Sequence, residues 1–178
     1  MQTQLVLCAI IADRPGTLER LVETVSRQRC QVRDCRATIM GEWRMVTLEV
    51  SGSWDRLALL ETALEQLGGE ETVSHLHWER VRAEMARTPG LPYVVDAIGL
   101  VDADMVTRIL QFLAEQGIRL RDLSTHCYVP PHGTDAMMSL RAQVDVPSTL
   151  HLGELKQHFF DLCDRLNLDA VLEPDRTA

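Results

Sequence analysis

The chain has 178 residues, of which 46% are hydrophobic, so it can bury the core of one medium-sized domain or the cores of two small ones. Its formal net charge at pH 7 is −8, its sequence pI is about 5.2 and its mean hydropathy is −0.07. A surface this acidic repels phosphate backbones, and no apolar run approaches the roughly 20 residues of a membrane-spanning helix. We therefore expect a cytoplasmic protein with no membrane partner and no direct contact with nucleic acid.

The first half of the chain predicts the element order βαββαβ. An apolar run predicts a strand over 5–12, and apolar spacing at i, i+3, i+4 and i+7 predicts a helix over 17–28. Strands follow over about 30–40 and between the Gly41-Glu42 turn and Ser51, the latter with strict alternation. A helix with Ser53 as N-cap ends at Gly68-Gly69, and a last strand covers about 72–81.

The second half predicts the same order after a charged, proline-containing linker over 83–92. The expected strands cover 93–101, 118–129, 136–146 and 169–173, and the expected helices cover 104–116 and 150–166. Ser148 or Thr149 is the expected N-cap of the last helix. The corresponding domains are 1–82 and 93–174, with a polar tail over 175–178.

One gap-free shift of 88 residues, from Asp34 to Asp122, relates the two halves. The same shift places one apolar helical stripe on another: Leu18, Leu21, Val22 and Val25 fall on Val106, Ile109, Leu110 and Leu113. A repeat of this length is too long for a solenoid unit and fits a duplicated small domain. The predicted fold class is α+β, with two ferredoxin-like βαββαβ domains in tandem, each an antiparallel sheet with helices on one face.

The turn Asp13-Arg14-Pro15-Gly16 lies between the first strand and the first helix. A glycine before a helix lets a ligand approach the backbone, and the free N–H groups of the first helical turn attract a carboxylate. An ordinary βα turn without a ligand is the alternative interpretation.

The histidine and cysteine patterns predict no metal site. His75 and His77 lie two apart on a predicted strand and share a face, but no third ligand is evident. The cysteines are odd in number and form no CxxC motif, so we expect buried or partly buried free thiols at Cys8, Cys30, Cys35, Cys127 and Cys163. No nucleophile elbow, phosphate loop or catalytic carboxylate pair is evident, so we expect neither enzymatic activity nor a cofactor.

The stretch from Leu5 to Met40 resembles an ACT domain, with its apolar strand, Asp-Arg-Pro-Gly turn, helix, and second strand carrying Asp34. The tandem arrangement, the short linker and the Ser-Gly-Ser-Trp run from Ser51 to Trp54 resemble the glycine cleavage system transcriptional repressor family. The resemblance covers nearly the whole chain and is stronger in the first half.

The resemblance implies a small amino acid, with glycine as the candidate, bound between the turn of one unit and the start of the second strand of another. It implies the following ligand-binding residues: Asp13, Arg14, Pro15, Gly16, Thr17, Gln31 and Asp34. Gln31 occupies a position where many amino-acid-binding ACT domains have Asn. For Asp34, as for Asp122, a structural carboxylate that pairs locally is the alternative.

The second half departs further from the family's pattern. Arg119 occupies the position of Gln31, and Val101-Asp102-Ala103-Asp104-Met105 replaces the Pro-Gly turn. The added carboxylates would repel a ligand carboxylate, so we expect the ligand turn of the second domain to be degenerate.

The resemblance further implies a regulatory, homo-oligomeric protein that senses an amino acid. Such a protein would repress the glycine cleavage operon by binding a LysR-type transcriptional activator rather than DNA. A detached allosteric subunit of an amino-acid metabolic enzyme is the alternative, because it uses the same domains. RNA recognition motifs share the βαββαβ order, but the predicted central strands, 6–10 and 46–50, lack the aromatic residues that such modules stack on bases.

Overall fold

The computed structural model describes residues 3–82 and 90–176 and divides into two compact units, Met1–Ala86 and Arg87–Ala178. Most of the predicted linker, 83–92, and the end of the predicted tail, 175–178, therefore lie outside the described residues.

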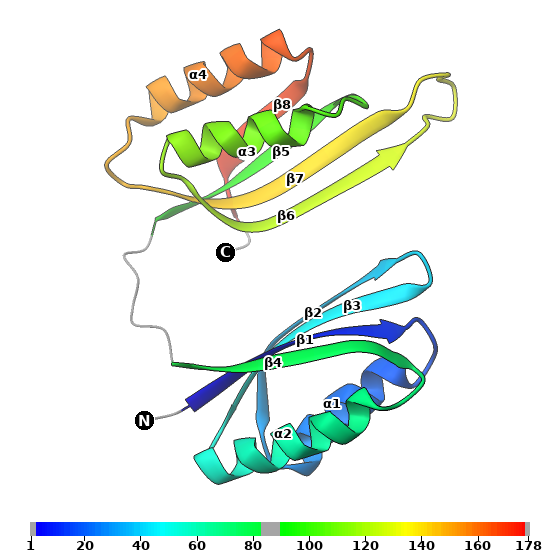
Figure 1. The fold of residues 1–178 in the computed structure, drawn as a ribbon. Coiled ribbons are helices and arrows are strands. Elements are labelled where there is room, and N and C mark those ends of the chain that lie inside the picture. The colour runs from blue at the N-terminus through cyan, green and yellow to red at the C-terminus, as the bar shows by residue number, and fades with distance from the viewer. Residues whose placement is uncertain (1–2, 83–89, 177–178) are drawn as a thin grey trace. The chain divides into compact units, whose positions relative to one another are not determined.

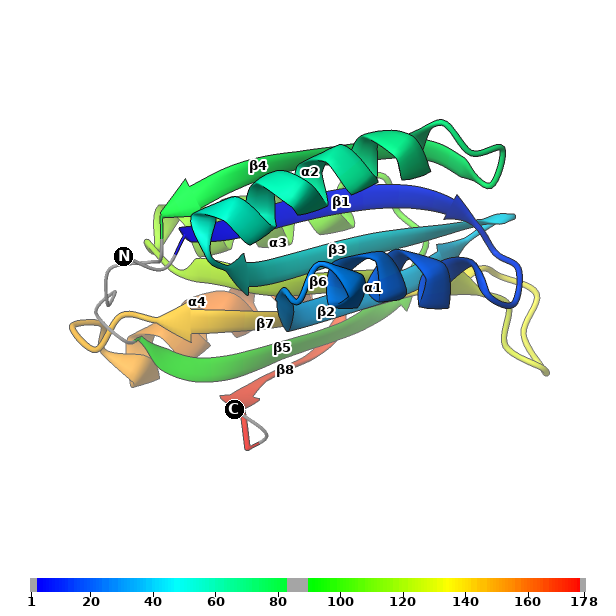
Figure 2. The same cartoon turned by 90° about the horizontal axis from the view of Figure 1, so that it is seen from below.

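The first unit has the predicted βαββαβ order (Figure 1). Its four strands form one antiparallel sheet in the order β2-β3-β1-β4. Both helices cover the same face, with α1 beside β2 and α2 beside β4 (Figure 2). The elements are β1 (Thr3–Ala12), α1 (Thr17–Arg27), β2 (Gln31–Met40), β3 (Trp43–Gly52), α2 (Trp54–Gly68) and β4 (Val73–Arg82).

The second unit repeats this topology, with the strand order β6-β7-β5-β8. Its elements are β5 (Leu91–Leu100), α3 (Met105–Glu115), β6 (Arg119–Tyr128), β7 (Met137–Val146), α4 (Leu152–Arg165) and β8 (Asp169–Pro174). The predicted fold class, two tandem α+β units with antiparallel sheets and helices on one face, is confirmed.

Each unit encloses its own hydrophobic core between its sheet and its two helices. In β3 the alternating residues Val46, Leu48 and Val50 are buried, as the period of two predicts. The apolar stripe of α2 supplies Leu57, Leu60, Leu64 and Leu67 to the same core. The core clusters of the two units share no residue.

The internal repeat extends to the irregularities of the sheets. The register between β2 and β3 shifts at Arg33, and the register between β6 and β7 shifts at Arg121, which lies 88 residues later. The offset then increases to 94 residues, from Trp43 to Met137, because the second hairpin carries a longer loop, as the Pro130–Gly133 run predicts.

The predicted cap of the last helix is wrong. The helix begins at Leu152, and His151 is its N-cap, with a side chain that accepts a 3.4 Å hydrogen bond from the Glu154 N–H. The Pro147 carbonyl accepts a bond from the Leu150 N–H, so Ser148 and Thr149 belong to a turn before the helix. Ser53 is the N-cap of α2, as predicted, but its side chain makes no capping bond.

The expectation of buried thiols is also wrong for three of the five cysteines. Cys30 and Cys163 are buried, whereas Cys8, Cys35 and Cys127 are exposed free thiols. The exposed thiols have a simple origin: Cys8 lies on the face of β1 opposite the helices, and the other two lie on the edge strands β2 and β6.

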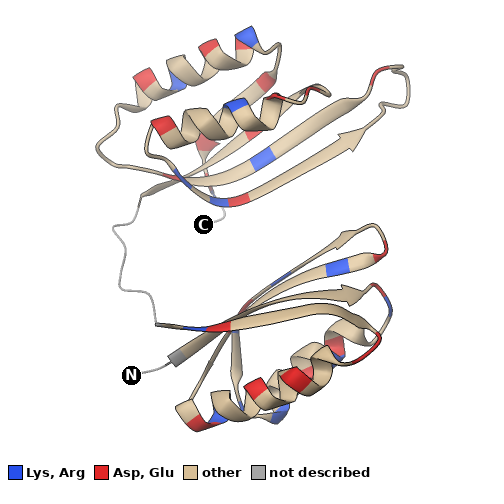
Figure 3. Ribbon diagram, viewed as in Figure 1, with Lys and Arg blue, Asp and Glu red and all other residues tan. Residues whose placement is uncertain are grey.

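Charged residues of both signs are interspersed along the elements of both units (Figure 3). Acidic residues predominate over the whole sequence, in keeping with the net charge of −8. Within residues 3–82 and 90–176, none of the helices combines the length and the apolar character needed to cross a bilayer.

Candidate functional site

The predicted ligand turn joins the end of β1 to the start of α1. Gly16 is the N-cap of α1 and adopts φ 90° and ψ −17°, a left-handed conformation that favours glycine. A Cβ added to Gly16 would meet no atom within 4 Å, so the backbone conformation and not crowding requires glycine at this position. Pro15 precedes Gly16; its ring fixes its own φ, and it has no backbone N–H to donate.

The start of α1 offers backbone donors. The Gly16 carbonyl accepts the first helical bond from the Arg20 N–H at 3.0 Å, and no described side chain caps the helix. The N–H groups of Leu18 and Glu19 therefore have no acceptor within the helix. The Thr17 hydroxyl instead donates back to the Arg14 carbonyl at 2.9 Å. These features suit a small anionic group such as a carboxylate.

An ion pair ties the turn to the neighbouring hairpin. Both Nε and Nη2 of Arg44, at 3.1 and 2.6 Å, donate to Oδ1 of Asp13. The Asp13 backbone N–H also donates to the Glu42 carbonyl at 3.2 Å. The Asp13 carboxylate is thus engaged inside its own unit.

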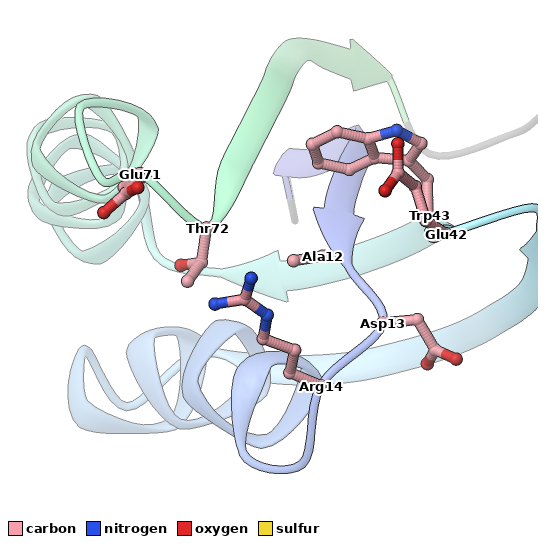
Figure 4. Close-up of a pocket in the computed structure, with 7 residues that line it drawn as sticks. All are labelled: Ala12, Asp13, Arg14, Glu42, Trp43, Glu71 and Thr72. Carbon is pink, nitrogen blue, oxygen red and sulfur yellow. The ribbon is translucent and has the colours of Figure 1, made fainter.

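Two shallow hollows flank the turn, and both Asp13 and Arg14 line each of them. The larger, of about 430 Å³, is bounded by the ends of β1, β3 and β4 and includes Trp43 and Thr72 (Figure 4). The smaller, of about 280 Å³, lies between the start of α1 and Arg44. In Figure 4 the Arg14 guanidinium points toward Thr72, whereas the Asp13 carboxylate points away from it. The Arg14 guanidinium can bind a ligand carboxylate. The Glu42 and Glu71 carboxylates also line the larger hollow, and Leu18 and Glu19, with their free backbone donors, line the smaller one.

Two predicted ligand residues lie at the opposite end of the sheet from the turn. Ala12 pairs with Trp43 at one end of β3, and Gln31 pairs with Ser51 at the other. Eight residues of extended strand span about 27 Å, so the turn and Gln31 of one unit cannot contact the same small ligand. Asp34 is exposed and pairs with Arg36 at 3.3 Å, which fits its structural interpretation.

The second unit has a different turn at the equivalent place. Asp104 is the N-cap of α3 with φ −93°, and its N–H donates to the side chain of Asp102 at 2.6 Å. Arg119, the counterpart of Gln31, forms an ion pair with Asp145 at 3.0 Å. The left-handed backbone conformation of Gly16 is therefore not repeated here, and the Asp102 side chain already lies at this turn.

The two strand histidines lie on the exposed, helix-free face of β4. His77 approaches Glu79 at 3.6 Å. Within the part of the chain that the structure describes, no group of three potential ligands is close enough to hold a metal ion.

Several lining residues could not be found from the sequence alone. Glu42, Trp43, Arg44, Glu71 and Thr72 reach the turn only because β3 and β4 flank β1 in the sheet. No local motif marks them. The one available signal was the alternation of the third strand, which predicts that this strand begins near Trp43. Once that strand is paired with β1, Arg44 lies near the end of β1.

Comparison with known proteins assigns a family to the first unit and identifies a relative of the whole chain. Residues 3–75, which contain the turn, match the ACT domain family. The glycine cleavage system transcriptional repressor of Escherichia coli (strain K12) is 25% identical over 167 residues, which cover 93% of this chain and 87% of the relative. The first unit matches the ACT domain family, the second unit repeats its topology, and the chain is similar to this repressor.

Two solved structures share the fold of both units over almost their full length. One, provisionally named a glycine cleavage system transcriptional repressor, has a TM-score of 0.74 at 22% identity and covers 97% of each chain. The other, an unknown protein from Galdieria sulphuraria, has a TM-score of 0.82 at 18% identity and covers 98% of this chain and 99% of its own. The family match lies in the first unit. The second unit has the same topology and is related to the first by the internal repeat.

Proposed function

We propose that this tandem ACT-domain protein is a regulatory sensor of a small amino acid, with glycine as the candidate ligand. The observation that carries this proposal is the similarity to a glycine cleavage repressor across both units, 93% of the chain, together with the Asp-Arg-Pro-Gly turn of the first unit. A sensor of this kind needs no catalytic group, which agrees with the expectation that the protein is not an enzyme.

The ligand chemistry follows from the charges at the turn. A zwitterionic amino acid needs hydrogen-bond donors for its carboxylate and acceptors for its ammonium group. The free N–H groups of Leu18 and Glu19 and the guanidinium of Arg14 can serve the carboxylate. A side-chain amide such as Gln31 can accept from the ammonium group through its carbonyl oxygen.

Gln31 must come from another copy of the chain, because it lies at the far end of the sheet from the turn of its own unit. We therefore propose a homo-oligomer in which the turn of the first unit of one copy faces the start of β2 of a second copy. Calorimetry at protein concentrations above and below the dissociation point of the oligomer tests this arrangement. If the monomer and the oligomer bind the amino acid with equal affinity, Gln31 is not part of the site.

The regulatory output is proposed to pass through a protein partner. The acidic chain opposes binding to DNA by charge, and we propose a LysR-type activator of the glycine cleavage operon as the target. Glycine can switch such a repressor only if it binds the free and the complexed forms with unequal affinity.

Isothermal titration with glycine and other small amino acids tests the ligand site. Gly16→Asp should abolish binding, because a carboxylate then occupies the start of α1. Gly16→Asn is the matched control, because Asn also tolerates the left-handed conformation but adds no charge. Equal affinity of the aspartate variant and the wild type would exclude the turn as the ligand site.

Capture of partners from the lysate of the source cell, with and without added glycine, tests the regulatory output. Recovery of a LysR-type regulator in a yield that depends on glycine supports the proposal. Recovery of a metabolic enzyme instead would support the alternative, a detached allosteric subunit, and would contradict the transcriptional role.

A further inference from the structure

We propose that Arg44 is the positioning residue of the ligand turn and that Asp13, its ion-pair partner, shapes the turn without contacting the ligand. This inference rests on the proposed amino-acid site and assigns separate roles to two neighbouring residues of one motif. Arg14 remains the side chain that faces the ligand, and Asp13 becomes part of the support.

The geometry of the pair is specific. Arg44 donates two hydrogen bonds to one oxygen of Asp13, and both side chains are partly shielded, with exposed fractions of 29% and 30%. Arg44 lies on β3 opposite Ile11, and Asp13 follows the end of β1, so the pair joins the hairpin to the first residue of the turn. Two hydrogen bonds between the same two side chains fix their relative orientation more firmly than one hydrogen bond does.

Asp13 and Arg14 are consecutive residues of the turn, so fixing the first also restrains the backbone that carries the second. Figure 4 shows the Asp13 and Arg14 side chains pointing apart. Holding Asp13 against Arg44 therefore leaves the Arg14 guanidinium in the larger hollow. Pairing also neutralises a carboxylate that would otherwise repel the carboxylate of the ligand.

The second unit provides an internal comparison. The repeat offset places Val101 at the position of Asp13, and the strand register places Met138 at the position of Arg44, so both partners are replaced by apolar residues. The backbone tether is kept, because the Val101 N–H donates to the Ala136 carbonyl as the Asp13 N–H donates to the Glu42 carbonyl. The left-handed turn is not kept, since Asp104 has φ −93° where Gly16 has φ 90°. The tether alone is therefore compatible with another turn, and the ion pair occurs together with the left-handed one.

Four variants of the full chain test the inference: Arg44→Met, Asp13→Val, the double variant, and Asp13→Asn. Each is measured by calorimetry with glycine and the amino acids that the wild type binds, by thermal unfolding, and by the amide chemical shifts of residues 14–19. Arg44→Met and Asp13→Val should each weaken binding at least tenfold. The double variant should be no weaker than either, because both remove the same pair. Asp13→Asn should retain most of the affinity, since its carbonyl oxygen still accepts from Arg44.

The Arg141–Asp96 pair supplies a matched control. It also joins two neighbouring strands, at 3.0 Å, but lies in the second unit far along the chain from the turn. Arg141→Met should change the melting temperature about as much as Arg44→Met does and should leave amino-acid affinity unchanged. A general loss of stability is thereby separated from an effect on the turn.

The outcomes separate failure of this inference from failure of the proposed function. If the wild type binds an amino acid and Arg44→Met binds it equally well, the inference is wrong. If Asp13→Val strengthens binding, the pair only masks charge, and its positioning role is likewise excluded. If the wild type binds no amino acid, the proposed ligand function fails, and only the amide chemical shifts test the role of Arg44. Unchanged shifts of residues 14–19 in Arg44→Met would then overturn the positioning role. Changed shifts of these residues would support it.

Discussion

At the scale of single residues, the left-handed conformation of Gly16 sets the shape of the ligand turn. Any other residue pays a backbone cost at φ 90°, although its side chain would have space. We expect Gly16→Ala to lower the free energy of unfolding by about 1 kcal/mol. Gly69→Ala is the control: Gly69 has φ −84° at the end of α2, so this change should be neutral or slightly stabilising. Urea unfolding of both variants measures the difference, and equal effects would contradict the conformational account.

Burial also separates the cysteines, which gives a test of thiol reactivity. Cys8, Cys35 and Cys127 are exposed, whereas Cys30 and Cys163 are buried. Burial, together with a smaller effect of the neighbouring Asp164 carboxylate, raises the pKa of Cys163 to about 11. We expect three thiols to react quickly with a thiolate-specific reagent in the native protein and all five to react after denaturation. Rapid labelling of Cys163 in the native state, located by peptide mass, would contradict the packing of α4.

The raised pKa of Cys163 also predicts a dependence of stability on pH. The thiol ionises near its ordinary pKa of 9.0 in the unfolded chain but only near 11 in the folded protein. The unfolded state therefore binds fewer protons between these values, and the free energy of unfolding falls as the pH rises from 9 to 11. Cys163→Ala should make this decline shallower. Urea titrations at several pH values across that window check the slope, and an unchanged slope would assign the decline to other groups.

At the scale of elements, a side-chain cluster ties the outer edge of α2 to the edge strand β4. Arg80 donates to both carboxylate oxygens of Glu61, at 2.7 and 2.8 Å, and its guanidinium lies 5.0 Å from the centre of the Trp54 ring. The hydrogen bond from Arg80 lowers the pKa of Glu61, although partial burial opposes the shift. The pair therefore stabilises the folded protein above the ordinary pKa of 4.5. This stabilisation is lost as the pH falls through the lower pKa that Glu61 has in the folded state.

We expect Arg80→Met to lower the free energy of unfolding at neutral pH by about 1 kcal/mol or less, because both side chains remain partly exposed. Most of the loss should disappear in acid, where Glu61 is protonated. A double-mutant cycle with Glu61→Gln, measured at pH 7 and at an acidic pH low enough to protonate Glu61 in the folded protein, isolates the pairwise energy. A coupling energy that is the same at both values would contradict the charge-based explanation.

At the scale of the whole molecule, the two hydrophobic cores are separate sets of residues. Leu64 is fully buried in the first core, and Phe159 is fully buried in the second. Leu64→Ala should lower the stability of the first unit by about 2–5 kcal/mol, and Phe159→Ala should lower that of the second by about 3–5 kcal/mol. Hydrogen exchange resolved by peptide checks in which unit protection falls. Equal loss in both units from either substitution would indicate one cooperative molecule.

The sequence by itself was sufficient to predict the element order, the repeat and the core. The reason is that these properties depend on local periodicity: alternation buries Val46, Leu48 and Val50, and helical spacing places Leu57 and Leu60 on one face of α2. Errors arose where local signals compete, as at the start of α4. There Ser148 and Thr149 have the chemistry of an N-cap, but the turn after Pro147 delays the helix to Leu152.

The candidate site divides in the same way. The turn from Asp13 to Gly16 is a contiguous motif and was recognised from sequence, as was its replacement in the second unit. Only the tertiary structure showed that Arg44 engages Asp13 and that Gln31 lies at the opposite end of the sheet. Those relations depend on which strands are neighbours in the sheet: the pairing of β1 with β3 brings together residues distant in sequence that no local motif marks. The sequence thus determined which residues form the turn, and the strand register decided which partners reach it.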